Sequence, residues 1–283
     1  MQFDLHCHTT ASDGRLTPDE LADAVEALSL DIFSLTDHDT VEGYLALKAA
    51  GRLDAAKHWV SGIEFSCVAL KQTIHIVGLD FDETQPSFVQ ALAEQARRRK
   101  QRGELIHQRL LKAGLPNVFE RALELAGSAE SLGRPHFARA LLEVEACKTE
   151  QQAFDRWLGN GKIGDVKLMW PELAEVVGWI NEAGGVAVLA HPLRYKMTFS
   201  KLRQLIELFD QAGGAGVEVV GQQAAPDKMK HLTRIVASHQ LAASGGSDFH
   251  DPNWHWAPLG RVDALPENLD PIWSRFKRTS ISI

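Results

Sequence analysis

Histidines and acidic residues recur at the ends of short apolar runs in this chain, and this pattern constrains both fold and chemistry. The sequence predicts seven strands at these runs, which are Phe3–Cys7, Ile32–Thr36, Val60–Glu64, Ile74–Leu79, Val186–Ala190, Val217–Val220 and Leu241–Ser244. Helical patterns separate most of the runs. Strands that alternate with helices favour parallel pairing in an α/β barrel or an open sheet.

Two helix starts support this alternation. Thr17, Pro18 and Glu20 provide an N-cap, a proline at the first helical position and a capping box. Trp170-Pro171-Glu172 opens a second helix, whose apolar residues repeat on one face.

One long segment interrupts the alternation of strands and helices. It has helical patterns but no strand pattern, with helices expected near Gly103–Ala113, Val118–Ala126 and His136–Glu143. We therefore predict an α/β barrel in two parts, 1–98 and 167–283, with a helical insertion domain at 99–166.

The polar residues at the strand ends form a candidate metal site. His6 and His8 are two apart in a strand, so their imidazoles point the same way, and Asp248 and His250 repeat this spacing. In an α/β barrel the carboxyl ends of the strands form the active-site face. The nine candidate ligands are His6, His8, Asp13, His38, Glu64, His75, His191, Asp248 and His250. Mixed nitrogen and oxygen ligands suit Mn, Fe or Zn better than Ca or Mg.

Each candidate also has a purely structural interpretation. Asp13 precedes Gly14 and fits an Asx-turn, and Asp37 and Asp39 fit helix caps. His75 fits a core histidine bonded to a carbonyl group, and His191 simply precedes a proline. Coincidence at six separate strand regions is harder to explain, so the joint pattern favours the metal site.

Composition limits the possible partners and location. The chain of 283 residues has a formal net charge of −7, which argues against tracking long nucleic acid by charge alone. Its three cysteines lack CxxC spacing, and we find neither a secretion signal nor a membrane-spanning run. We expect a cytoplasmic protein without a membrane partner, and the sequence leaves its oligomeric state open.

The same motifs resemble those of the polymerase-and-histidinol-phosphatase (PHP) phosphoesterases. The matching segments are Asp4-Leu5-His6-Cys7-His8, Thr36-Asp37-His38-Asp39, Glu64, His75, Ala190-His191-Pro192 and Ser247-Asp248-Phe249-His250. The resemblance spans nearly the whole chain. It implies an α/β fold, a distorted seven-stranded (β/α) barrel, with the helical insertion capping the active site.

Two further segments, Gly133–Arg139 and Arg156–Lys162, resemble one branch of that family. The branch contains bacterial 3′,5′-nucleoside bisphosphate phosphatases and relatives that trim short RNAs from the 5′ end. The resemblance implies two or three Mn²⁺ ions per chain, with zinc and iron left open. It groups the ligands as His6/His8/Glu64/Asp248, as Glu64/His75/His191 with Glu64 bridging, and as Asp13/His38/His250.

By this resemblance the chain removes the 3′-phosphate of nucleoside 3′,5′-bisphosphates, with Glu64, Asp248 and His191 in catalysis. The expected substrate contacts are Arg134, His136, Arg194 and Asp39. Asp39 and a metal-bound water are both candidates for the general acid. The alternative functions are a 5′→3′ exoribonuclease on short RNA, a metal-dependent amidohydrolase and a nucleotide-binding module without turnover.

For two other features we prefer a structural explanation to a functional one. The run Arg97-Arg98-Arg99-Lys100-Gln101-Arg102 is typical of the solvated face of a helix. Trp254 and Trp256 follow the last metal motif, and packing is favoured over stacking on a base.

Overall fold

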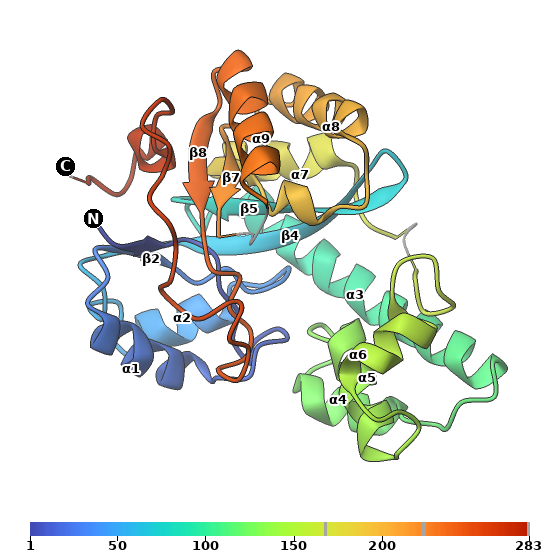
Figure 1. Ribbon diagram of the computed structural model, residues 1–283. Helices are drawn as coiled ribbons and strands as arrows, with labels where there is room; N and C mark the ends of the chain where they lie inside the picture. The colour runs from blue at the N-terminus through green and yellow to red at the C-terminus, as the bar shows by residue number, and fades with distance from the viewer. Residues whose placement is uncertain (167–168, 222–224, 282–283) are drawn as a thin grey trace.

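The computed structural model describes residues 1–166, 169–221 and 225–281 and has two sheets with helices around them (Figure 1). Residue 167, where the second predicted barrel segment begins, lies outside the described residues. The three-stranded sheet is parallel, with β1 (Phe3–Asp4), β2 (Ile32–Ser34) and β3 (His58–Val60). The five-stranded sheet has the order β4 (Gly62–Ala69), β5 (Gln72–Leu79), β6 (Val186–Leu189), β7 (Gly216–Val220) and β8 (Ala242–Gly245).

The structure differs from the predicted distorted seven-stranded (β/α) barrel in two respects. The run Val60–Glu64 contains the end of β3 and the start of β4, so the described residues form eight strands, and neither sheet closes on itself. Strand β5 pairs antiparallel with both β4 and β6. The reason is the two-residue turn at Leu70 and Lys71, with φ of 50° and 62°, because such a turn can join only antiparallel strands.

Isolated bridges join the two sheets where regular pairing stops. Cys7 pairs with Phe249 beyond the ends of β1 and β8, and His38 pairs with Glu64 between the β2 region and β4. The backbone N–H of Asp39 also donates to the carbonyl oxygen of Glu64 at 2.9 Å. The sheets therefore meet along the segments that carry the predicted metal ligands.

Helices cover the outer faces of both sheets (Figure 1). They are α1 (Pro18–Leu28), α2 (Glu42–Ala49), α7 (Leu173–Glu182), α8 (Phe199–Gln211) and α9 (Pro226–Ser238), with the short 3₁₀ helices η2 (Pro192–Arg194) and η3 (Ile272–Arg275). The capping box predicted for Thr17 and Glu20 is confirmed. The second predicted helix start is confirmed as well, because α7 begins directly after Glu172. No helix in the described part of the chain is both long enough and apolar enough to cross a bilayer.

The remaining helices form a lobe at one side of the sheets (Figure 1). They are α3 (Pro86–Lys112), α4 (Phe119–Ala126), α5 (Arg134–Glu143), α6 (Glu150–Ala153) and the π-helix η1 (Phe154–Leu158). The lobe has its own apolar core, which includes Ile106 and Phe137, whereas Phe88 at the start of α3 packs in the main core. Helix α3 thus runs unbroken through the domain boundary predicted at residue 98.

Two glycines give a matched prediction about packing. A Cβ on Gly246 would lie 2.5 Å from the backbone nitrogen of His6, whereas a Cβ on Gly178 in α7 meets nothing within 4 Å. We expect Gly246→Ala to destabilise the protein by roughly 1–3 kcal/mol through overpacking. Gly178→Ala removes backbone freedom from a helix and should stabilise it by about 0.5–1 kcal/mol. Urea unfolding measures both, and equal effects would contradict this account of Gly246.

Candidate metal centre and arginine pocket

The structure brings all nine predicted metal ligands together at the junction of the two sheets. Their donor atoms form four overlapping groups, each with ligand atoms within 4.8 Å of one another. The groups are His8/Asp13/His38/His250, His6/His8/Asp248, His6/Glu64/His191 and His38/Glu64/His75. His8 therefore lies in the Asp13 group as well as beside Asp248, and the grouping differs in this respect from the one that the resemblance implies.

Glu64 lies at the centre of the cluster and is fully buried. Its carboxylate oxygens lie 2.9–3.3 Å from ring nitrogens of five imidazoles, those of His6, His8, His38, His75 and His191. Burial alone would raise the pKa of Glu64, but His38, His6 and His75 outweigh it and hold the pKa well below its ordinary value. An ionised carboxylate in this position can bridge two cations.

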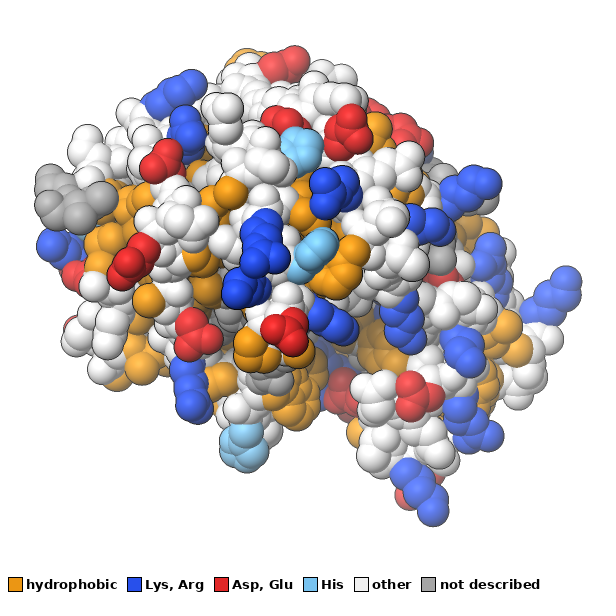
Figure 2. Space-filling view, turned by 45° about the horizontal axis from the view of Figure 1, so that its top comes forward, with side chains coloured by type: hydrophobic (Ala, Val, Ile, Leu, Met, Phe, Trp, Pro, Cys, Tyr) orange, Lys and Arg blue, Asp and Glu red, His pale blue; other side chains and the backbone are white. Residues whose placement is uncertain are grey.

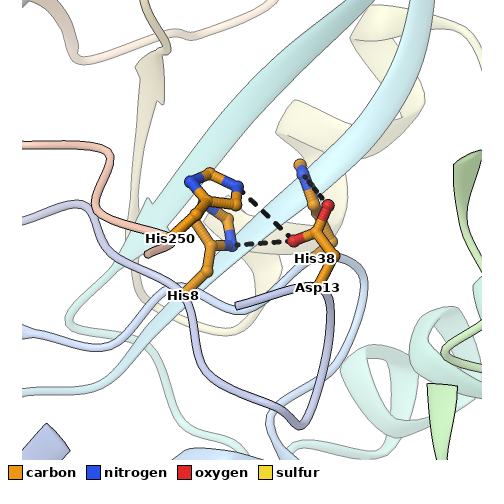
Figure 3. Close-up of side chains that lie close together, drawn as sticks. All are labelled: His8, Asp13, His38 and His250. Atoms are coloured by element: carbon orange, nitrogen blue, oxygen red, sulfur yellow. Dashed lines mark ion pairs between the residues drawn. The ribbon is translucent and has the colours of Figure 1, made fainter. Parts of the chain in front are cut away.

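Asp13 organises the outer part of the cluster (Figure 3). One of its oxygens lies 3.4 Å from His250 and 3.9 Å from His8, and the other lies 3.8 Å from His38. The three rings converge on Asp13 from separate segments of the chain, as Figure 3 shows. These separations are too long for good hydrogen bonds, so the four side chains surround a space between them.

Several buried nitrogen and oxygen atoms of the cluster, each able to bind a metal ion, make no hydrogen bond to the described residues. They include Nδ1 of His8, Nδ1 of His38 and Oε2 of Glu64. The last two lie only 2.9 Å apart without hydrogen-bond geometry. Buried polar atoms normally have a hydrogen-bond partner. Neighbouring nitrogen and oxygen atoms whose lone pairs meet no hydrogen-bond donor are therefore suited to coordinating a cation. The donor set of imidazole nitrogens and carboxylate oxygens suits Mn, Fe or Zn.

Backbone conformation at the site is unusual. His191 has φ of 30°, Asp248 has φ of 53° and Asp39 has φ of 56°. The left-handed region is uncommon for residues other than glycine and costs on the order of 1–3 kcal/mol each. Strain of this kind persists only where surrounding contacts enforce it, and here it directs two ligand side chains into the cluster.

Glu218 supports the cluster and was missed by the sequence analysis. Its Oε1 accepts from Nδ1 of His6 at 2.7 Å, and its Oε2 accepts from the backbone N–H of His191 at 2.6 Å. This leaves Nε2 of His6 directed at Glu64 and Asp248. A glutamate in the apolar run Val217–Val220 was the available signal, because an acidic residue in a buried strand needs a partner.

The predicted arginine contacts lie beside the cluster. Arg134, at the start of α5, lines a small pocket together with His38 and His75, and its Nη1 donates to the carbonyl oxygen of Leu158 at 3.1 Å. Arg194 forms a close ion pair with Asp248. Both guanidinium groups therefore border the site, and their contact with substrate stays a prediction.

His136 and Asp39 are engaged within the protein. The backbone N–H of Gly133 donates to Nδ1 of His136, and burial lowers the pKa of His136 to about 4. Oxygens of Asp39 accept from the backbone N–H of Ser66 and from Nε of Arg99, at 2.6 and 2.7 Å. Their direct contact with substrate also stays a prediction.

The preferred interpretation of the arginine run in α3 is wrong for two of its members. Arg97 is exposed, but Arg99 and Arg102 are buried and line the same small pocket as Arg134. Arg102 lies 5.2 Å from the centre of the Trp170 ring, and it forms no ion pair with the described carboxylates. Burial lowers the pKa of Arg102 to about 9, and the cations of Arg134 and Arg99 add to the effect. Three guanidinium groups line one pocket, those of Arg99 and Arg102 buried and that of Arg134 half-buried, and guanidinium groups are suited to binding anions.

Comparison with known proteins shows the family to which this chain belongs. A family model described as "PHP domain" matches residues 4–183. A 5′-3′ exoribonuclease of Haemophilus influenzae is 38% identical over 275 residues, which are 97% of this chain and 99% of the relative. A 3′,5′-nucleoside bisphosphate phosphatase of Chromobacterium violaceum is 37% identical over 271 residues, which are 96% of this chain and 95% of the relative.

Two solved structures show the same fold over nearly the whole chain. One is named as an amidohydrolase from Chromobacterium violaceum with bound sulfate and no metal; it has a TM-score of 0.88 and 37% identity, and the match covers 97% of this chain and 95% of that one. The other is a candidate metal-dependent phosphoesterase from Bifidobacterium adolescentis, with a TM-score of 0.80 and 27% identity, over 97% and 96% of the two chains.

The fold and the ligand cluster together define a metal-dependent phosphoesterase. The chain belongs to the PHP domain family, as the resemblance in its sequence predicted.

Glu218 provides a test of how the ligands are held. We expect Glu218→Gln to keep the fold but to weaken metal binding roughly 10–100-fold, because a neutral amide orients and polarises His6 less well than a carboxylate does. Metal titration against a chelating indicator measures the change. Glu207→Gln on the exposed face of α8 is the control. Unchanged metal affinity in Glu218→Gln would show that Glu218 only fills space.

Proposed function

We propose that this phosphoesterase removes the 3′-phosphate of nucleoside 3′,5′-bisphosphates and releases a 5′-mononucleotide and inorganic phosphate. One observation carries the proposal, namely that two anion sites lie side by side. The first is the metal-ligand cluster, and the second is the arginine pocket of Arg99, Arg102 and Arg134. His38, His75 and Asp13 line the arginine pocket and also belong to the cluster.

A nucleoside bisphosphate matches this pair of sites. Its two phosphates are separated by one ribose, so one phosphate can occupy the cluster while the other is bound by the guanidinium groups. We assign the 3′-phosphate to the cluster and the 5′-phosphate to the arginine pocket. Asp39 then acts through Arg99, because their ion pair fixes that guanidinium at the pocket wall.

The net charge of −7 does not oppose an anionic substrate. On the face drawn in Figure 2, Lys and Arg side chains gather toward the lower right, on the side of the helical lobe. Divalent cations bound to the cluster would supply Lewis-acid activation of water and neutralise charge on the phosphoryl group. Manganese, in two or three ions per chain, is the proposed cofactor.

The side chains of the site have separate roles in holding the cluster and the substrate. Glu64 holds the cluster together from its centre, and Asp248 and His191 enter it on strained backbone. Arg194 pairs with Asp248 at the rim of a pocket that Arg134 and Asn160 also line. We propose that Arg194 holds an oxygen of the scissile phosphate there. The helical lobe contributes Arg134 and so covers the site.

The second candidate function is a 5′→3′ exoribonuclease on short RNA, favoured by the names of relatives that are 38% identical. A 5′-phosphorylated RNA presents the same 5′-phosphate to the arginine pocket. An amidohydrolase would have no use for the arginine pocket, because its amide substrate carries no phosphate for the guanidinium groups to bind. A binding module without turnover would have no use for the complete set of metal ligands.

Phosphate release by the manganese-loaded protein decides among these functions. The substrates are adenosine 3′,5′-bisphosphate, AMP, 3′-AMP and a 5′-phosphorylated RNA trimer, with chromatography of the products. We expect preference for the bisphosphate, with AMP as the product. Preferred conversion of the trimer to mononucleotides would move the assignment to RNA trimming, and no hydrolysis of any of them would refute both.

Arg134→Ala tests the arginine pocket. We expect kcat/KM for adenosine 3′,5′-bisphosphate to fall roughly 10–100-fold, because one charge-assisted phosphate contact is worth about 1.5–3 kcal/mol. The value for 3′-AMP, which has no 5′-phosphate, should change much less. Arg97→Ala in the same arginine run is the matched control, because Arg97 is exposed. Equal losses on both substrates would exclude a 5′-phosphate site.

Glu64→Gln tests the centre of the cluster. We expect turnover and stoichiometric metal loading to be lost while the far-UV circular dichroism spectrum is retained, since an amide cannot bridge cations as a carboxylate does. Metal content by mass spectrometry and phosphate release are the measurements. A variant with near-normal activity would contradict the bridging role.

A further inference from the structure

A second pocket adjoins the metal-ligand cluster and has no role in the hydrolysis of a mononucleotide. It has a volume of about 600 Å³ and lies between the helical lobe and the segment that follows β8. Asp13 lines both this pocket and the arginine pocket, whereas His250 lines this one and His75 lines the other. The two pockets therefore approach the cluster at different ligands.

One wall of this pocket is a stack of aromatic rings that begins at a metal ligand. The ring centroid of His250 lies 5.7 Å from that of Trp254, with 30° between the planes. Trp254 in turn stacks on Trp256, with centroids 5.1 Å apart and 22° between the planes. We call these three rings the aromatic wall.

Trp256 is 55% exposed, although it is one of the largest apolar side chains in the protein. One face of its ring packs on Trp254, and more than half of the side chain remains accessible to solvent. An exposed ring stacked at the mouth of a pocket provides a platform for another flat group.

The opposite side of the pocket is formed by the helical lobe and carries cations. Arg139 and Lys148 line it together with Phe154 and with Glu150, whose carboxylate lies 3.8 Å from Arg139. Aromatic faces combined with cations are the features with which proteins bind single-stranded nucleic acid, because every base has a π-face and every linkage carries a negative charge. The chemistry of this pocket therefore matches a nucleotide.

We propose that this pocket is a subsite for the base of the nucleotide that follows the scissile phosphate when the substrate is a short 5′-phosphorylated oligonucleotide. The inference rests on the proposed placement of the 5′-phosphate in the arginine pocket and of the next phosphate at the cluster. A nucleotide attached beyond that phosphate leaves the cluster on another side. The aromatic wall begins there, at His250.

The same bond is broken in both substrates. Water adds its oxygen to phosphorus, the bond from phosphorus to O3′ of the first nucleoside breaks, and O3′ takes up a proton. With the bisphosphate the products are a 5′-mononucleotide and inorganic phosphate. With an oligonucleotide the products are the same mononucleotide and a chain shortened by one residue, which keeps the phosphate at its new 5′ end.

The test compares three substrates of the manganese-loaded full chain. They are 5′-phosphorylated ApA, the same dinucleotide with an abasic second residue, and adenosine 3′,5′-bisphosphate. For the wild type we expect the KM of ApA to be roughly tenfold lower than that of the abasic analogue, which is about the effect of one stacked base. Trp256→Ala should abolish this difference, and Trp256→Phe should restore most of it.

Hydrolysis of the bisphosphate is the internal control, because this substrate has no second base. Its KM and kcat should be the same in the wild type and in Trp256→Ala. Leu208→Ala, which truncates an exposed apolar side chain on α8, should leave all three substrates unchanged. Equal loss on all three substrates in Trp256→Ala, or equal KM for ApA and its abasic analogue in the wild type, would overturn the inference.

The outcome is separate from that of the proposed function. Failure to hydrolyse the bisphosphate, together with turnover of ApA that depends on Trp256, would refute the phosphatase and support this pocket. Hydrolysis of the bisphosphate without any effect of the second base would support the phosphatase and refute the pocket.

Discussion

The buried carboxylate of Glu64 is the contact on which the site depends. It lies where β4 begins, within reach of five imidazoles that come from both sheets. Removing a carboxylate from water is costly unless cations or donors surround it. The two sheets, which do not form one continuous barrel, meet at the polar groups of the candidate metal site. Metal bound there would stabilise the folded chain relative to the unfolded one.

The sequence predicted the clustering of the candidate ligands better than it predicted the pairing of the strands. Ligand positions follow from residue type and from strand ends, and all nine side chains converge as expected. Strand pairing was harder because apolar runs do not encode direction. The turn at Leu70 and Lys71 makes the β4–β5 hairpin antiparallel, and neither residue is the glycine or asparagine that usually marks such a turn.

Two charged residues beside the candidate site were not predicted from the sequence, and the physical reason is the same for both. Glu218 and Arg102 are charged residues in patterns that predict a buried strand and a solvated helix face. Their roles depend on what lies opposite them in space, which is His6 for Glu218 and Trp170 with Arg134 for Arg102. Local periodicity contains no information on such partners. The assignment of the arginine run to solvent was correct for Arg97 and wrong for Arg99 and Arg102.

A short relay of contacts connects the metal-ligand cluster to the arginine pocket. The backbone of Asp39 donates to the carbonyl oxygen of Glu64, and the side chain of Asp39 holds Arg99 at 2.7 Å. Arg102 lies three residues further along the same rigid helix, a rise of about 4.5 Å. Under the proposed function, the distance from the Glu64 carboxylate to these guanidinium groups would act as a molecular ruler. It would select substrates by the separation of two phosphates, which in a nucleoside bisphosphate is the length of one ribose.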